Sequence, residues 1–228
     1  MTVGEALEEA LRGWGDHPCL LEVNRQQGVV STGPRELQLR IAERAAALQD
    51  WGIQRGHFVA LFLNNSTEFI TTFLALLQLR AVPVLAKMEY RRIELDEIFG
   101  NARPEAVIAE KDHLPLLSPY LEGATVIERK NGALHPAQYG KGGPPRPDLP
   151  PELASINYTY RGCGYPLGAM LSHAQYLHGA RVLQDGLQGD RGEKMLAILP
   201  MVHIFTLVGC ILVPLLYGLT CVIADTMH

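Results

Sequence analysis

The sequence lacks the cysteine pairs that a structural zinc site needs. Its four cysteines, Cys19, Cys163, Cys210 and Cys221, lie at wide and irregular intervals, and none belongs to a C-x-x-C pair. Structural zinc is usually held by such closely spaced pairs, so we expect no metal site. The simplest interpretation is that the thiols are reduced and that the protein is cytoplasmic.

The sequence also has little basic charge. It contains 20 Lys and Arg residues against 24 Asp and Glu residues, which gives a formal net charge of −4. A nucleic-acid-binding domain usually has an excess of positive charge, so no nucleic-acid partner is expected. The N-terminus has no basic start followed by an apolar run, so no signal peptide is expected. A hydrophobic content of 47% is ordinary for a globular protein and too high for a disordered one.

Charged side chains are absent between Met195 and Ala224, a stretch that is long enough to cross a bilayer. Pro200 and Pro214 interrupt it, however. The pattern predicts a buried strand, a helix and a second buried strand, at 195–199, 203–218 and 219–224. The alternative, a membrane span, predicts one continuous helix over the whole stretch.

The preceding part of the chain alternates between strand and helix patterns. Helices are predicted at 34–52, 67–80 and 93–102, and strands at 57–63, 81–86, 105–110 and 124–129. Ser66 is in position to cap the helix that follows it. This alternation predicts an α/β fold with a mostly parallel sheet and helices on both faces.

Residues 136–151 hold six prolines and three glycines, which disfavour both helix and strand. We expect an irregular, exposed linker there. It would separate a first α/β lobe, residues 1–135, from the start of a second lobe, residues 152–228. In the second lobe the pattern predicts a strand at 153–160, a loop, and a helix over 172–187.

The loop of this second lobe has the outline of a phosphate-binding turn. Residues 156–173, INYTYRGCGYPLGAMLSH, read as a strand, a glycine-bearing loop and a helix that begins at Ser172. The segment resembles the signature of the adenylate-forming superfamily, which runs Y-T-S-G-T-T-G-x-P-K-G-V. The matching residues are Tyr158, Thr159, Gly164, Pro166 and Gly168.

Two further collinear segments resemble the same superfamily, which includes acyl-CoA synthetases, fatty acyl-AMP ligases and peptide-synthetase adenylation domains. They are VALFLNNSTEFITTFLALLQLRAVPVLA, residues 59–86, and LPMVHIFTLVGCILVPLLYGLTCVI, residues 199–223. The resemblance runs from about residue 35 to the end of the chain. It implies the N-terminal part of an acyl-CoA synthetase-like fold, truncated before the adenine-binding motif and the C-terminal domain of that family.

The loop departs from the family where the chemistry lies. In the family, small hydroxyl residues and glycine wrap the ATP phosphates and a lysine supports them, whereas this chain has Tyr160, Arg161, Gly162, Cys163 and Leu167. Each missing charge-assisted bond forfeits roughly 1.5–3 kcal/mol. We therefore expect a degenerate loop, no cofactor and no catalytic residue; alternatively, Arg161 holds a phosphate from another direction. The degenerate loop comprises Thr159, Tyr160, Arg161, Gly162, Cys163, Gly164, Leu167 and Gly168.

The resemblance also implies an acyl pocket. A histidine at the position of His203 lies at the pocket wall in relatives, and the apolar residues beside it would line the cavity. We expect a fatty acid or acyl-CoA to bind there, in contact with His203, Ile204, Phe205, Leu207 and Val208. The alternative is that this histidine and its neighbours are ordinary core.

Three hypotheses follow. The chain is a non-catalytic carrier or sensor of fatty acids or acyl-CoA, an interaction subunit or homodimeric scaffold, or one half of a split ligase. A homodimer is also expected, because apolar surface left uncovered by the missing part of the fold needs burial. His173 and His178 share one predicted helix without a third ligand, so no metal site is expected there.

Overall fold

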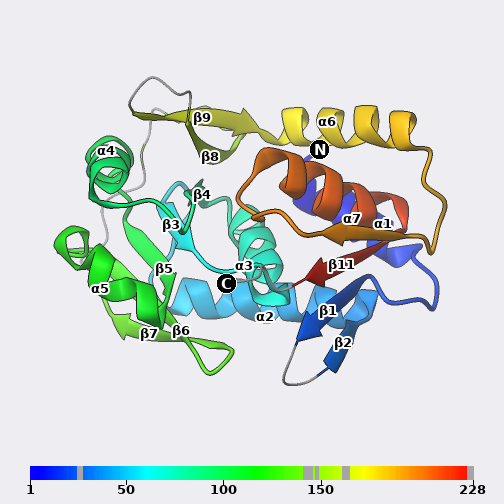
Figure 1. Ribbon diagram of the computed structural model, residues 1–228, viewed down its shortest axis with the longest axis horizontal. Helices are drawn as coiled ribbons and strands as arrows, with labels where there is room; N and C mark the ends of the chain where they lie inside the picture. Colours follow the sequence, from blue (N-terminus) through cyan, green and yellow to red (C-terminus); the bar gives the residue numbers. More distant parts are fainter. Residues whose placement is uncertain (25–27, 141–145, 147–148, 161–164, 225–228) are drawn as a thin grey trace. The chain divides into compact units, whose positions relative to one another are not determined.

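The computed structural model describes residues 1–24, 28–140, 146, 149–160 and 165–224 (Figure 1). The chain divides into two compact units that interleave along the sequence. The first unit holds Met1–Arg44, Asn64–Ala75 and Ser172–His228, and the second holds Ala45–Leu63 and Leu76–Leu171. Units defined by contacts need not coincide with lobes defined along the chain, so the division at 136–151 stays a prediction.

The second unit contains a sheet of seven strands in the order β7-β6-β5-β3-β4-β8-β9. The pairs β3–β4, β3–β5, β5–β6 and β4–β8 are parallel, and β6–β7 is antiparallel. The expected α/β fold with mostly parallel strands is thereby confirmed. The strands are β3 (Phe58–Phe62), β4 (Val82–Leu85), β5 (Ala106–Glu110), β6 (Thr125–Lys130), β7 (Ala133–Gln138), β8 (Leu153–Tyr160) and β9 (Pro166–Ser172).

β3 occupies the middle of this sheet because its side chains suit a strand buried on both faces. All five are apolar and buried, which is typical of a parallel strand with helices on both sides of its sheet. α4 (Arg92–Ala102) contributes Leu95, Ile98 and Phe99 to the same apolar cluster as Phe58 and Phe62. α5 (Leu114–Leu117) follows β5, between single 3-10 turns at Lys111–His113 and Ser118–Tyr120.

The prediction that 136–151 lacks regular structure is wrong for its first residues. β7 extends to Gln138, pairs with β6, and includes Pro136. A proline has no N–H to donate, but β7 is the last strand of the sheet and needs partners on only one side. The register of the pair shifts between Val126 and Ile127. Residues 141–145 and 147–148 lie outside the described part of the chain.

Arg146 ties the later part of the same segment to the end of α4. Its Nη2 donates to the main-chain oxygens of Ala102, at 2.7 Å, and Arg103, at 2.6 Å. It also forms an ion pair with Glu105 at 3.1 Å, and its Cζ lies 4.0 Å from the centre of the Phe58 ring. Unpaired carbonyls at a helix C-terminus favour a cation, so this position is held by several interactions at once.

The first unit contains a sheet of four strands in the order β10-β11-β1-β2. β10–β11 and β1–β11 are parallel, whereas β1–β2 is antiparallel. The sequence analysis did not predict β1, β2 or the N-terminal helix α1 (Val3–Arg12). The strands are β1 (Leu20–Asn24), β2 (Gly28–Thr32), β10 (Lys194–Ala197) and β11 (Thr220–Ala224).

The remaining helices follow the predicted positions closely. They are α2 (Pro34–Asp50), α3 (Thr67–Gln78) and α6 (His173–Leu187). α7 (Val213–Tyr217) covers only the last part of the helix predicted at 203–218. Ser66 caps α3 as predicted, since its Oγ accepts a hydrogen bond from the N–H of Phe69 at 3.2 Å. Ser172 caps α6 in the same way, with the N–H of Gln175 as donor at 3.2 Å.

The charge-free segment forms a strand, a helical stretch and a strand, as predicted. β10 is followed by a π-helical stretch at Thr206–Leu212, then by α7 and β11. Among the residues that the structure describes, no helix is both long and apolar enough to span a bilayer. The predicted burial of 195–199 is wrong, however, because Leu196, Ile198 and Leu199 are 51%, 54% and 50% exposed.

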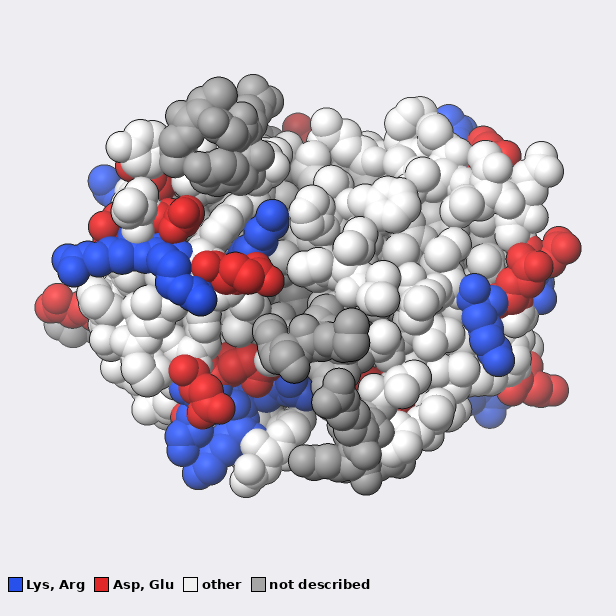
Figure 2. Space-filling view, in the orientation of Figure 1, with Lys and Arg blue, Asp and Glu red and all other residues white. Residues whose placement is uncertain are grey.

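Charged side chains of both signs lie near one another on the face drawn in Figure 2. Within α2, Arg40 and Glu36 approach to 2.6 Å. Neither sign forms one large continuous patch on this face.

Gly140 is a position where the second unit leaves no room for a side chain. A Cβ there would lie 2.4 Å from the main-chain carbon of Ala124 and 2.4 Å from the nitrogen of Thr125. We predict that Gly140→Ala lowers the free energy of unfolding by about 1–3 kcal/mol, the usual cost of overpacking. Urea denaturation measures this cost.

Gly100, inside α4, provides the matched control, because a Cβ there meets no atom within 4 Å. Gly100→Ala should leave stability unchanged or raise it by about 0.5–1 kcal/mol, since alanine favours the helix. Equal urea midpoints for Gly140→Ala and the unmodified protein would contradict the prediction.

Candidate functional site

The segment that resembles the phosphate-binding turn lies between two strands of the second unit. β8 ends at Tyr160 and β9 begins at Pro166, whereas the sequence predicts a loop that continues to the start of α6. Of the loop residues singled out, Arg161, Gly162, Cys163 and Gly164 lie outside the described part of the chain. The residues on both sides of them are described.

Gly168 allows β9 to approach the side chains of β8. A Cβ at Gly168 would lie 2.9 Å from Cγ2 of Ile156 and 3.1 Å from Cζ of Tyr158. Tyr158 is only 6% exposed, and burial raises its pKa, with a smaller contribution from the charge of Glu97. Gly168 and Tyr158 therefore have a packing role that is independent of any nucleotide.

Leu167 and Thr159 have no comparable packing role. Leu167, at the position of the family's lysine, is 51% exposed, and Thr159 is also exposed. The leucine side chain offers neither charge nor hydrogen bond to a phosphate. The structure thus describes an exposed apolar side chain, at the start of β9, at the position of the family's lysine.

The second candidate site, in the first unit, begins with a tight turn after β10. The N–H of His203 donates to the main-chain oxygen of Pro200 at 2.9 Å, and the N–H of Leu207 donates to that of His203 at 2.9 Å. His203 is exposed, and so are Ile204, at 43%, and Phe205, at 57%. The alternative interpretation, that His203 is buried in the core, is therefore wrong.

The other two residues predicted for this site point into the protein. Leu207 is 0% and Val208 is 7% exposed, inside the π-helical stretch Thr206–Leu212. Phe205 lies next to Gly209, whose ideal Cβ would be 3.8 Å from Cε2 of the ring. Such π-helical turns are uncommon and occur frequently at functional sites. The structure therefore divides the predicted set into an exposed part, 203–205, and a buried part.

Asn65 holds the turn that precedes His203, and no local pattern in the sequence predicts this role. Its Nδ2 donates to the main-chain oxygen of Leu199 at 2.8 Å, and its Oδ1 accepts from the N–H of Met201 at 2.8 Å. The only signal in the sequence is that Asn65 belongs to an Asn-Asn-Ser cluster, residues 64–66, directly before the predicted helix.

Two cavities lie away from these segments. One, of about 570 Å³, is lined by residues of α1, α6 and α7, with Glu9 and Arg181 among them. The other, of about 430 Å³, is lined by Asp96, Arg103 and Tyr120 in the second unit. Burial and the hydrogen bond from its hydroxyl to Asp96 raise the pKa of Tyr120 to about 12. The charged lining residues are exposed, and exposed charges contribute little binding energy, so we assign no ligand to either cavity.

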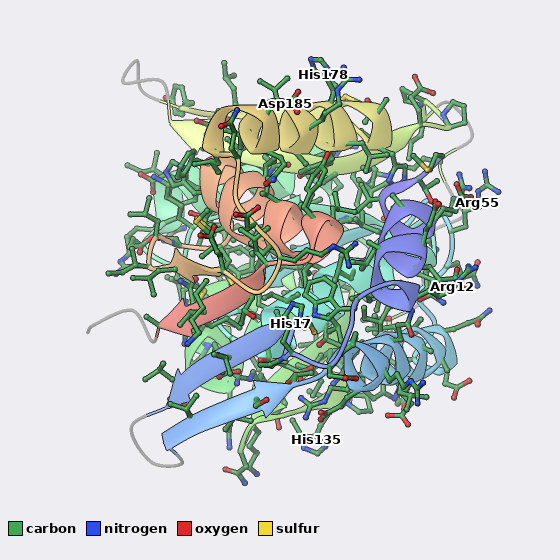
Figure 3. All side chains as sticks on the ribbon, turned by 90° about the vertical axis from the view of Figure 1, so that its right-hand side faces the viewer. Arg12, His17, Arg55, His135, His178 and Asp185 are labelled. Atoms are coloured by element: carbon green, nitrogen blue, oxygen red, sulfur yellow. The ribbon has the colours of Figure 1, made fainter. Side chains whose placement is uncertain are left out.

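The histidines of α6 do not converge on a common point. His173 is buried, and its Nδ1 accepts from the N–H of Val3 at 3.4 Å. His178 is exposed, lies on the outer side of α6 (Figure 3), and contacts Nη2 of Arg181 at 3.4 Å. Among the described residues, no group of three His, Cys, Asp or Glu side chains is arranged to hold a metal ion. The expectation of no metal site stays a prediction.

A family model described as AMP-binding enzyme matches residues 7–228. The chain belongs to this family. Among curated members, it is 25% identical over 223 residues to 4-coumarate-CoA ligase 1 of Narcissus pseudonarcissus, covering 91% of this chain and 40% of the relative. It is 30% identical over 204 residues to the olefin beta-lactone synthetase of Stenotrophomonas maltophilia (strain K279a), covering 84% and 35%. The chain thus spans about 40% of the length of these relatives.

Solved structures of the family share the fold. The anthranilate CoA ligase AuaEII, in complex with anthranoyl-AMP, matches with a TM-score of 0.81 at 20% identity, over 100% of this chain and 44% of its own. A long-chain-fatty-acid-CoA ligase from Archaeoglobus fulgidus matches with a TM-score of 0.81 at 20% identity, over 100% and 47%. At these identities the likeness shows the fold alone.

The described cysteines of this AMP-binding family member are buried. Cys19, Cys210 and Cys221 lie in the first unit, and burial raises the pKa of Cys19 to about 12 and that of both others. A raised pKa keeps the thiol protonated at pH 8, and the thiol is far less nucleophilic than the thiolate. We predict that iodoacetamide at pH 8 leaves these three cysteines unmodified in the native protein, as read by peptide mass mapping.

The control for this prediction is the same reaction in 6 M guanidinium chloride, where all three cysteines should be modified. Rapid modification of Cys19 in the native protein would contradict the described burial. The same burial fixes how native stability depends on pH, because an unfolded thiol ionises near its ordinary pKa while a buried thiol stays protonated. Native stability should therefore fall as the pH rises above about 9.

Proposed function

We propose that this chain is a non-catalytic, acyl-CoA synthetase-like member of the AMP-binding family, a pseudoenzyme that binds a fatty acid or its CoA thioester. The observation that carries the proposal is the continuous exposure of His203, Ile204 and Phe205. An exposed polar group followed directly by exposed apolar side chains suits a ligand with a polar head and an apolar chain. A structural relative is named a long-chain-fatty-acid-CoA ligase, which supports this class of ligand.

The expected loss of catalysis rests on the phosphate-binding turn. Leu167 stands where the family has a lysine, and Tyr160 and Arg161 stand where it has serine and glycine. Phosphate binding by such a turn needs close approach of the backbone and small hydroxyl donors. Bulky side chains hinder that approach, and each lost charge-assisted bond costs roughly 1.5–3 kcal/mol.

Acyl binding does not depend on that turn. Each methylene removed from water contributes about 0.8 kcal/mol, whatever the state of the phosphate loop. His203 would add a hydrogen bond to the carboxylate or thioester carbonyl, worth about 0.5–1.5 kcal/mol. Leu207 and Val208 are buried and would hold the exposed segment in place by packing in the core.

An interaction subunit, including a homodimer, is a second candidate, and one observation favours it. Five large apolar side chains between residues 196 and 205 are at least 43% exposed, namely Leu196, Ile198, Leu199, Ile204 and Phe205. Clustered apolar surface on a soluble protein often marks a binding face. A split ligase is the third candidate and requires a second chain. In each case we propose a cytoplasmic location.

A chain-length series tests the acyl proposal. Affinity for fatty acids from eight to eighteen carbons, and for the matching acyl-CoAs, should rise by up to about fourfold per methylene until the contact surface ends. His203→Ala should weaken every member by about 2- to 10-fold without changing the slope, because it removes only the polar contact. Isothermal titration calorimetry gives both quantities.

His178→Ala is the matched control, because His178 is an exposed histidine of the same unit, on α6. It should bind like the unmodified protein. Flat affinity along the series, or the absence of saturable binding, would sink the acyl proposal. Light scattering on the same samples then decides for or against the homodimer.

ATP gives a separate prediction. The native protein should show no saturable heat of ATP binding below about 1 mM, because Leu167 provides no cation for the phosphates. Leu167→Lys alone should not restore binding, since Tyr160 and Arg161 remain in the turn. Micromolar ATP affinity of the native protein would overturn the non-catalytic interpretation and favour a phosphate contact from Arg161.

A further inference from the structure

We infer that Asn65 positions the proposed acyl-contacting segment, residues 199–205, an inference that rests on the proposed function. The Asn65 side chain makes two hydrogen bonds to main-chain atoms 134 and 136 positions further along the chain. Through these bonds it joins the residues just before α3 to the turn before His203.

The geometry of the contact resembles that of a neighbouring strand. Leu199 provides a carbonyl and Met201 an N–H, at 2.8 Å each, on either side of Pro200, which has no N–H of its own. One end of the Asn65 amide donates and the other accepts, so it satisfies both main-chain groups at once. If the amide were turned over, its NH₂ group would face the N–H of Met201, donor against donor. The two hydrogen bonds therefore determine which way the amide points.

Asn65 is itself held from the other side. The next residue, Ser66, caps α3 through the N–H of Phe69 and donates its hydroxyl proton to the main-chain oxygen of Asn64 at 3.0 Å. The N–H of Thr67 donates to Glu22 at 2.8 Å. The main chain beside Asn65 is therefore anchored twice, by the cap of α3 and by Glu22, so it stays in place when the cap alone is removed.

The turn before His203 connects the Asn65 contact to the exposed residues 203–205. Met201 is 1% exposed and anchors the turn in the core, and the N–H of His203 is bonded to Pro200, the residue that Asn65 brackets. The helical stretch then begins with the bond from Leu207 to His203. Loss of the Asn65 bonds would leave Pro200 held only by its chain neighbours, so His203 and Phe205 would lose their fixed direction.

The chemistry of the contact is specific to asparagine. The Asn65→Asp change keeps the shape of the side chain, but a carboxylate has no donor and would place an oxygen against the carbonyl of Leu199. Asn65→Asp is therefore the sharpest test, and Asn65→Ala is a second variant that removes both bonds without adding a charge. Ser66→Ala is the matched control, because it removes the neighbouring cap of α3 and leaves the Asn65 contact intact.

The first measurement is amide hydrogen exchange at Met201, His203 and Leu207. We expect it to accelerate at least about tenfold at all three amides in Asn65→Ala, relative to amides in β11, and to stay unchanged in Ser66→Ala. In Asn65→Asp we expect the same acceleration at His203 and Leu207, whereas the Met201 N–H keeps an oxygen acceptor. The second is palmitate affinity, which should fall at least about fivefold in the Asn65 variants while Ser66→Ala binds normally. A uniform loss of stability would accelerate all amides and would not give this pattern.

The outcomes separate the inference from the proposed function. Exchange at the three amides that is unchanged, or equal in Asn65→Asp and Ser66→Ala, overturns the inference with or without a ligand. Unaltered palmitate affinity in Asn65 variants whose exchange is accelerated also overturns it. If the unmodified protein binds no palmitate but exchange accelerates only in the Asn65 variants, the proposed function fails and the positioning role stands.

Discussion

Parallel pairing of β3 on both of its edges is the constraint on which the seven-stranded sheet depends. β4 and β5 satisfy its main chain, and all five of its side chains are buried, so no polar group of this strand needs water. Because β4 also pairs in parallel with β8, the carboxyl ends of β3, β4, β5 and β8 lie at one edge. In open α/β sheets that edge is where ligands bind, and β8 ends there, within the segment that resembles a phosphate-binding turn.

The sequence predicts those parts of the fold whose signal is local. α2, α3, α4, α6 and the buried strands lie within a few residues of their predicted bounds, since an apolar period and a cap define each of them. β7 and β9 were not predicted, because proline and glycine disfavour strands. β7 is an edge strand and tolerates Pro136, and in β9 the close packing requires Gly168. α1 had a readable capping box, Thr2 with Glu5, that the sequence analysis did not use.

The candidate acyl site was predictable only in part, for two physical reasons. Hydrophobicity does not distinguish Phe205, which is exposed, from Leu207, which is buried. The π-helical stretch makes this harder, since it changes the helical period that assigns residues to faces. The role of Asn65 could not be predicted for another reason. Its hydrogen-bond partners lie 134 and 136 positions away, and no local sequence pattern indicates such a contact.

Packing accounts for most of the described positions that match the family signature. Tyr158 and Pro166 are buried, and Gly168 leaves room for the Tyr158 ring, so changing any of them would cost packing energy in the second unit. Leu167 is exposed, so a change there costs the fold little and removes the charge that phosphate needs. Thr159 is the exception, because it matches the signature although it is exposed. Apart from that residue, the described positions that match are those that the packing requires, and Leu167, which differs, is free to vary. Packing alone would therefore preserve a recognisable signature even in a chain that binds no nucleotide.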